Sequence, residues 1–141
     1  MKKREGTGFT LIEAMVLVAV LGILAAIGIP NYSRYVTRGN LVEAGNALSE
    51  YHVAMDQFYK DNRTYSKSGS CGQALPSNVS DFKIACALAA GGQEFTATAT
   101  GTGSAAGFVY AINQANLRST TAMPSHWGTQ PDNAGTTWVT R

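Results

Sequence analysis

The chain opens with a short charged segment and then runs through about 21 mostly apolar residues, from Phe9 to Ile29. As a helix rising 1.5 Å per residue, this run would be roughly 31 Å long, enough to cross the hydrocarbon core of a bilayer. A secretory signal has a shorter hydrophobic region, of about 7 to 15 residues. The pattern therefore predicts a membrane-spanning helix near the N-terminus.

After this run, apolar residues recur at spacings of three and four. The stripe consists of Leu41, Ala44, Leu48, Tyr51, Met55 and Phe58. Such spacing is typical of an amphipathic helix that packs one side on another element. Pro30 lacks a backbone N–H, so we expect it to kink or locally melt the helix, with Gly28 adding slack, and the helix to resume afterwards. A long helix over residues 9–62 is predicted.

Four later segments have strand character, at residues 81–89, 94–101, 108–114 and 117–123. In the second, apolar residues alternate with threonines, which is the period of a half-buried strand. We read residues 66–72 as a Ser/Gly-rich loop and residues 101–107 as a hairpin turn. Consecutive short strands favour an antiparallel meander whose apolar face covers the helix stripe, so the predicted fold class is α+β.

The last 18 residues, from Pro124, are rich in Gly, Thr and Pro and contain Trp127 and Trp138. One interpretation places this tail across the sheet edge with the tryptophans as anchors. The other makes it an exposed adhesive or subunit-contact loop. The sequence leaves both open.

Charge is concentrated at the N-terminus. The formal net charge is +2, and residues 1–8 carry three basic residues and one acidic residue, so the remainder is near neutral. This cluster of Lys and Arg predicts a cytoplasmic N-terminus and a translocated head. A near-neutral head gives no strong reason for nucleic-acid binding, which rests on cations that neutralise phosphates. The candidate contacts are scattered in sequence: Lys67, Lys83, Arg118 and Arg141.

Cys71 and Cys86 are the two cysteines and enclose 14 residues. They lack Cys-x-x-Cys spacing and a nearby histidine, which disfavours a metal site, although reduced or metal-bound thiols remain an alternative. In an exported chain the pair predicts a disulfide worth roughly 3 kcal/mol.

No catalytic residue, cofactor or metal is predicted. His52 and His126 are the two histidines, and His52 is expected to flank the packed helix face. Residues 101–107 differ from a dinucleotide-binding loop because the third glycine is one position late and no helix follows. The recognised catalytic and nucleotide-binding motifs are lacking, so we do not expect an enzyme.

Glu13 is the single charge within the apolar run. A carboxylate facing lipid is costly, so it usually has a partner or a function. If the chain were cleaved after Gly8, the new α-amino group of Phe9 would provide a cation nearby. The alternative is that Glu13 lies shallowly in the headgroup layer.

The segment from Gly8 through Phe9 to Glu13 resembles the cleavage and methylation motif of type IV prepilins. Gly22 and Pro30 fall where that family places its helix-loosening residues, and Tyr32 where it places its first aromatic. The resemblance implies a pilin fold, cleavage after Gly8 by a prepilin peptidase and N-methylation of Phe9. It also implies that Glu13 neutralises the N-terminal amine of a neighbouring subunit during assembly.

The implied organisation is a leader at residues 1–8, a transmembrane and filament-core segment at 9–30, and a periplasmic or extracellular head at 31–141. The implied precursor is a single-pass inner-membrane protein that later enters an extracellular pilus. Its implied partners are other pilin subunits and the inner-membrane assembly machinery.

Residues 32–65 most resemble a minor pilin of the PilE-like kind, contributing to pilus assembly, twitching motility, adhesion or DNA uptake. Major pilins usually close a C-terminal loop with their disulfide, whereas Cys71 and Cys86 are expected between helix and sheet. One alternative is a type II secretion pseudopilin, but its Ca²⁺-binding loop needs several acids and Asp132 alone follows Glu94. Another alternative is a DNA-binding competence pilin, which would add weak DNA binding.

Overall fold

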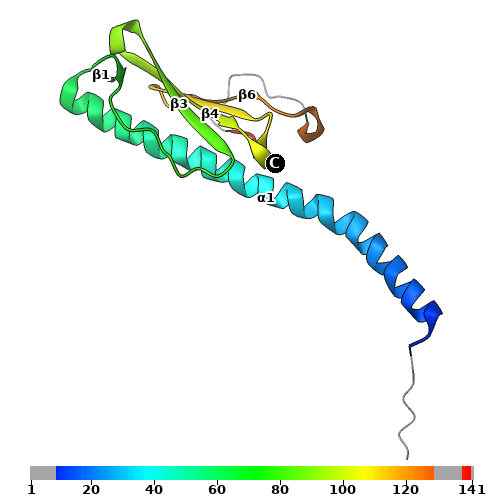
Figure 1. Cartoon of the computed structure of the whole chain (residues 1–141). Helices are drawn as coiled ribbons and strands as arrows, with labels where there is room; N and C mark the ends of the chain where they lie inside the picture. The colour runs from blue at the N-terminus through cyan, green and yellow to red at the C-terminus, as the bar shows by residue number, and fades with distance from the viewer. Residues whose placement is uncertain (1–8, 129–137, 141) are drawn as a thin grey trace, which may run out of the picture. The chain divides into compact units, whose positions relative to one another are not determined.

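A computed structural model describes residues 9–128 and 138–140. The chain divides into two compact units, Met1–Tyr35 and Val36–Arg141, which we describe separately. The element order is one long helix followed by short strands and 3₁₀ turns (Figure 1). This is the α+β arrangement predicted from the sequence.

Helix α1 spans Leu11–Asn62 and includes Pro30. The Asn31 side-chain amide donates to the Ile27 carbonyl at 3.0 Å, and the Ser33 hydroxyl donates to the Pro30 carbonyl at 2.9 Å. The helix therefore continues through Pro30 with no melted turn in the described backbone. The predicted continuation is confirmed, while a kink at Gly22 or Pro30 stays a prediction.

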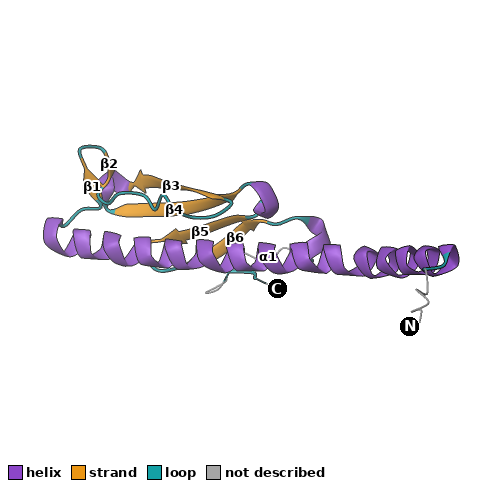
Figure 2. Ribbon diagram, turned by 60° about the horizontal axis from the view of Figure 1, so that its bottom comes forward, coloured by secondary structure: helices purple, strands orange, loops and turns teal. Residues whose placement is uncertain are grey.

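The main sheet has four antiparallel strands in sequence order: β3 (Phe82–Ala89), β4 (Glu94–Gly101), β5 (Val109–Asn113) and β6 (Arg118–Ala122). Figure 2 shows this sheet lying along the second half of α1. The register pairs Phe82 with Gly101 and Thr100 with Val109. Each predicted strand forms within two residues of its expected bounds, and residues 101–107 connect β4 to β5 through the 3₁₀ turn η2 (Gly103–Ala105).

The predicted loop at residues 66–72 is partly wrong. A small hairpin forms there from β1 (Ser66–Lys67) and β2 (Ser70–Cys71). Its two-residue turn has positive φ at both positions, 52° at Ser68 and 84° at Gly69. Positive φ at both central residues matches the right-handed twist of paired strands, so this turn closes a hairpin despite the polar sequence.

The core of the second unit lies between the helix stripe and one face of the sheet. Leu41, Ala44, Leu48 and Met55 are completely buried, and Tyr51 nearly so. On β4 the residues Phe95, Ala97 and Ala99 are buried, as their alternation with threonines predicts.

Phe58 ends the stripe at the margin of the core. Its ring lies against Gly72, where an added Cβ would be 2.3 Å from the ring, so a larger residue would displace Phe58.

Both described tryptophans of the tail pack against this core. Trp127 packs edge-to-face on Phe108 with the ring centres 5.2 Å apart, and Trp138 stacks on Tyr110 with the ring centres 6.0 Å apart. The Trp138 indole N–H donates to the Ala111 carbonyl at 3.1 Å. These contacts agree with the anchoring interpretation. The alternative of an adhesive or contact loop concerns mainly residues 129–137, outside the described residues.

Candidate assembly segment and its supporting head

The first half of α1 presents an almost unbroken apolar surface. Its large side chains are between about half and four-fifths exposed within the described structure, from Val20 at 47% to Leu11 at 80%. The segment has the length and composition of a membrane span. An exposed apolar surface of this extent marks contact with a membrane or with other proteins.

Thr10 and Glu13 fix the start of the helix by reciprocal hydrogen bonds. The backbone N–H and the hydroxyl of Thr10 donate to Glu13 Oε2 at 3.0 and 2.8 Å, and the Glu13 N–H donates to the Thr10 hydroxyl at 3.3 Å. This is a capping box, with Thr10 at the N-cap and Glu13 three residues later. The sequence analysis missed it, although the Thr-x-x-Glu spacing at residues 10–13 is its signal.

The capped Glu13 carboxylate can still accept further hydrogen bonds. An ionised carboxylate offers about four lone-pair sites, and Thr10 occupies one oxygen. Glu13 shares a helix face with Phe9, Ile12, Val16 and other apolar residues. The structure therefore places a positioned acid on an apolar surface, close in sequence to Phe9. A cationic group approaching that face would pair with it.

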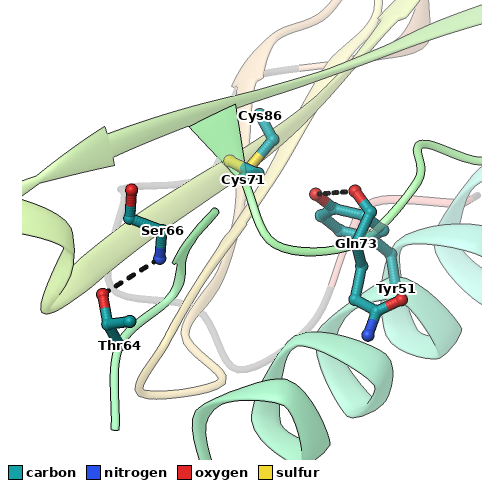
Figure 3. The surroundings of a disulfide bond; sticks show 6 residues. All are labelled: Tyr51, Thr64, Ser66, Cys71, Gln73 and Cys86. Carbon is teal, nitrogen blue, oxygen red and sulfur yellow. Dashed lines mark hydrogen bonds between the residues drawn. A yellow bond between two sulfur atoms is a disulfide. The ribbon is translucent and has the colours of Figure 1, made fainter. Parts of the chain in front are cut away.

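A disulfide joins Cys71 to Cys86, with the two Cα atoms 6.3 Å apart (Figure 3). Cys71 lies at the end of β2, and Cys86 lies in the middle of β3 opposite Ala97. The predicted disulfide is present. Both cysteines were expected between the helix and the sheet, which is wrong for Cys86, because it lies within strand β3 of the sheet. The bond ties the hairpin after α1 to the edge strand. Next to it, the Tyr51 hydroxyl donates to the Gln73 carbonyl at 3.4 Å.

Asp81 holds together three segments of the head. Its Oδ2 accepts from the Ser104 hydroxyl at 2.6 Å, the Ser104 N–H at 3.1 Å and the Asn40 amide at 3.1 Å. These hydrogen bonds, with Ser104 dominant, hold the pKa of the Asp81 carboxyl below its usual value. The helix, the start of β3 and the β4–β5 connection therefore share one carboxylate, which the sequence did not indicate.

A family model described as "Type IV minor pilin ComP, DNA uptake sequence receptor" matches residues 30–108. Fimbrial protein EcpC of Eikenella corrodens is 37% identical over 109 residues, covering 76% of this chain and 71% of EcpC. The chain belongs to the type IV pilin family.

Other relatives match over less of their length. The type IV major fimbrial protein FimA of Dichelobacter nodosus is 36% identical over 95 residues, 67% of this pilin and 56% of FimA. The type IV major pilin PilE1 of Neisseria gonorrhoeae is 36% identical over 76 residues, 54% of this pilin and 35% of PilE1. The pilin thus spans about half or less of these two relatives. No solved structure gives a significant match.

Family and fold together make this pilin a structural subunit of a type IV pilus. The family model begins its match at Pro30, so it does not reach Gly8, Phe9 or Glu13. Their processing and assembly roles stay predictions.

The described residues among the four predicted phosphate contacts, Lys67, Lys83 and Arg118, do not lie on one strand or edge. Lys83 lies on β3, one edge of the sheet, and Arg118 on β6, the other edge. At about 4.8 Å per strand step, three steps separate them by roughly 14 Å. Lys67 is exposed in β1, and Arg141 lies outside the described residues. Sheet order therefore keeps Lys83 and Arg118 apart.

His52 flanks the packed face of the pilin head, as predicted. It is 8% exposed, its Nδ1 lies 3.6 Å from Asp56, and its ring centre lies 5.9 Å from that of Phe95. Asp132, considered for a Ca²⁺ loop, lies outside the described residues. In the described part of the chain, no three His, Cys, Asp or Glu side chains cluster as metal ligands would.

Proposed function

We propose that this pilin is a minor subunit of its pilus and enters the filament through the first half of α1. The proposal includes cleavage after Gly8 by a prepilin peptidase, N-methylation of Phe9 and transfer by the inner-membrane assembly machinery. The minor role is supported by the matched family model, which is described as a type IV minor pilin. Entry through the helix is supported by the contrast between the two units. The head has a closed core, whereas the large apolar side chains between Phe9 and Ile29 are exposed.

The exposed helix surface needs an apolar environment before and after assembly. Burying one large aliphatic side chain is worth about 1.5–3 kcal/mol, so exposure of the whole segment to water is prohibitive. Lipid tails are as apolar as the side chains of neighbouring helices, so hydrophobicity barely distinguishes membrane from filament core. Selection between the two states must come from packing and polar contacts.

Glu13 supplies such a contact. An α-amino group about 4 Å from the carboxylate would be attracted by roughly 4 kcal/mol at an effective dielectric constant of 20. The capping box holds the carboxylate at the helix start, close to where a mature N-terminus at Phe9 would lie. An amine from a neighbouring subunit would therefore fix the axial register of two helices whose apolar surfaces alone do not define it.

The test is the location and abundance of the chain in its native cell. Immunogold electron microscopy and quantification of sheared filaments should find this pilin along type IV pili as a small fraction of total subunits. A dominant share would make it a major pilin, as FimA and PilE1 are named. Complete absence from filaments of piliated cells would overturn the proposal.

DNA binding is a second candidate function, supported by the matched family model, whose description names a DNA uptake sequence receptor. The head exposes Lys60, Arg63 and Lys67 within eight residues at the end of α1 and in β1. Cations so grouped could contact successive phosphates.

Retention of the detergent-solubilised chain on duplex DNA should fall as salt rises. Replacing these three residues by Gln should flatten the slope of log K against log salt by up to about three units. The matched control is Lys83→Gln near the start of β3, a single exposed lysine outside this group, with little expected change. No retention at low salt removes this candidate.

A further inference from the structure

Two tyrosines follow the apolar run of α1 directly and remain exposed. Tyr32 is 71% exposed and Tyr35 is 74% exposed, whereas the other tyrosines of the chain belong to the head core or pack against it. Neither of the two hydroxyls has a hydrogen-bond partner among the described residues. A spacing of three places both rings on one side of the helix. These side chains are therefore free to contact something outside the chain.

Arg34 lies between the two tyrosines and brings a positive charge to the same turn of the helix. It is exposed, and it is the single charged residue between positions 14 and 37. No acid occurs in the sequence between Glu13 and Glu43, and Arg34 forms no ion pair with a described acid. The three basic residues of the leader still outnumber Arg34 and Arg38, which follow the span closely, so the predicted orientation is unaffected.

The length of the helix places this group at the depth of a headgroup layer. The 21 steps from Glu13 to Arg34 correspond to roughly 32 Å at 1.5 Å per residue. The hydrocarbon core of a bilayer is about 30 Å thick, and about 40–45 Å with its headgroups. With Glu13 at the inner boundary of the hydrocarbon, Arg34 and the tyrosines beside it would lie just beyond the outer boundary.

The three side chains have the chemistry that a headgroup layer requires. Tyrosine places an apolar ring against acyl chains and a hydroxyl among polar groups, and it is enriched at membrane interfaces. Arginine binds phosphate through a planar fork of N–H donors. We propose that Tyr32, Arg34 and Tyr35 bind anionic phospholipid headgroups in the leaflet facing the head, a contact that rests on the membrane stage of the proposed function.

The arrangement around the helix favours lipid over a single partner surface. Successive helical positions point about 100° apart, so Arg34 points nearly opposite to Tyr32. A neighbouring protein would reach one side of the helix, whereas lipid surrounds a helix that crosses the membrane alone. A free phosphate ion would contact Arg34 and leave both tyrosine rings in water. A headgroup layer accommodates all three side chains at once.

The test measures lipid binding to the detergent-solubilised full chain by native mass spectrometry. Phosphatidylglycerol and phosphatidylcholine with the same acyl chains are supplied at equal concentration. Wild type should retain phosphatidylglycerol about fivefold more than phosphatidylcholine, the preference expected from one arginine near an anionic surface. Arg34→Gln should remove this preference, since it removes the charge.

The matched control is Arg63→Gln, which removes an exposed arginine just after the end of α1 and should keep the preference. Replacing Tyr32 and Tyr35 together by Ala should lower the retention of both lipids to the same extent, because tyrosine does not distinguish their charge. Excess inorganic phosphate should not displace phosphatidylglycerol.

Equal retention of the two lipids by wild type, or a preference that survives Arg34→Gln, would overturn the proposal. An equal loss in Arg63→Gln would assign the preference to overall positive charge, and displacement by inorganic phosphate would assign it to a free-ion site. Unchanged retention in the double tyrosine variant would remove the tyrosines from the contact, and each of these results also counts against the proposal. Release of wild-type chain from native membranes by alkaline carbonate would instead reject the membrane stage of the proposed function.

Discussion

Replacing Glu13 by Gln separates the two roles that the structure gives this residue. In the folded chain Glu13 accepts two hydrogen bonds from Thr10 and caps the helix. Glutamine also completes a capping box, so the Glu13→Gln variant keeps the helix start and loses the negative charge. Any defect in assembly then reports the charge and not the fold of the segment.

The expected size of the defect follows from the pairing energy. The full attraction to an α-amino group is about 4 kcal/mol at an effective dielectric constant of 20, and glutamine can still accept a neutral hydrogen bond. Charge-assisted hydrogen bonds contribute about 1.5–3 kcal/mol, against about 1 kcal/mol for neutral ones. The difference is on the order of 1–2 kcal/mol per subunit, which corresponds to roughly 5- to 30-fold.

The assay measures the ratio of chain in sheared filaments to chain in membranes by immunoblot, with leader cleavage followed by intact mass. We expect Glu13→Gln to be cleaved normally and to enter filaments 5- to 30-fold less than wild type. The control is Thr10→Val, which removes the capping hydroxyl at a cost of about 1 kcal/mol and keeps the charge. Normal incorporation of Glu13→Gln, or an equal defect in Thr10→Val, would refute the charge-pairing argument.

Two predictions concern the head. Replacing Cys71 and Cys86 together by Ser should lower its free energy of unfolding by roughly 3 kcal/mol, measured by denaturant titration of the full chain in detergent; an unchanged midpoint would show that the bond contributes nothing. Because the pKa of Asp81 is lowered in the folded state, its stabilising effect is present at neutral pH and is lost as the pH falls below about 4, toward the folded pKa. Asp81→Asn should therefore lower the melting temperature at pH 7 and make it less sensitive to acid below pH 4, and an identical acid profile in both proteins would contradict this.

The spacing of apolar residues predicted the second half of α1 and strand β4 because each of these elements buries one face only. The helix stripe from Leu41 to Met55 and the alternation of Phe95 with its neighbours each mark a face that must leave water. The β1–β2 hairpin escaped prediction because two-residue strands of Ser, Lys and Cys carry no such pattern. Their pairing depends on the backbone angles at Ser68 and Gly69.

Some candidate sites are visible in the local sequence, and others depend on the folded structure. Glu13 stands out in the sequence because a charge interrupts an apolar run, while its capping role needed only the local Thr-x-x-Glu spacing. The Asp81 cluster joins residues 23 and 41 positions away, so no local pattern could reveal it. The position of Arg118 over the Trp138 ring depends on its strand and on the return of Trp138 to the helix at Gly45, which are properties of the folded head.

The central claim is that a processed chain is built into a filament through its N-terminal helix. Intact-mass and N-terminal analysis of the chain from sheared native filaments tests it most directly. The account predicts a mature chain that begins at N-methylated Phe9 and carries an intact bond between Cys71 and Cys86. A chain in filaments that still begins at Met1 would contradict it.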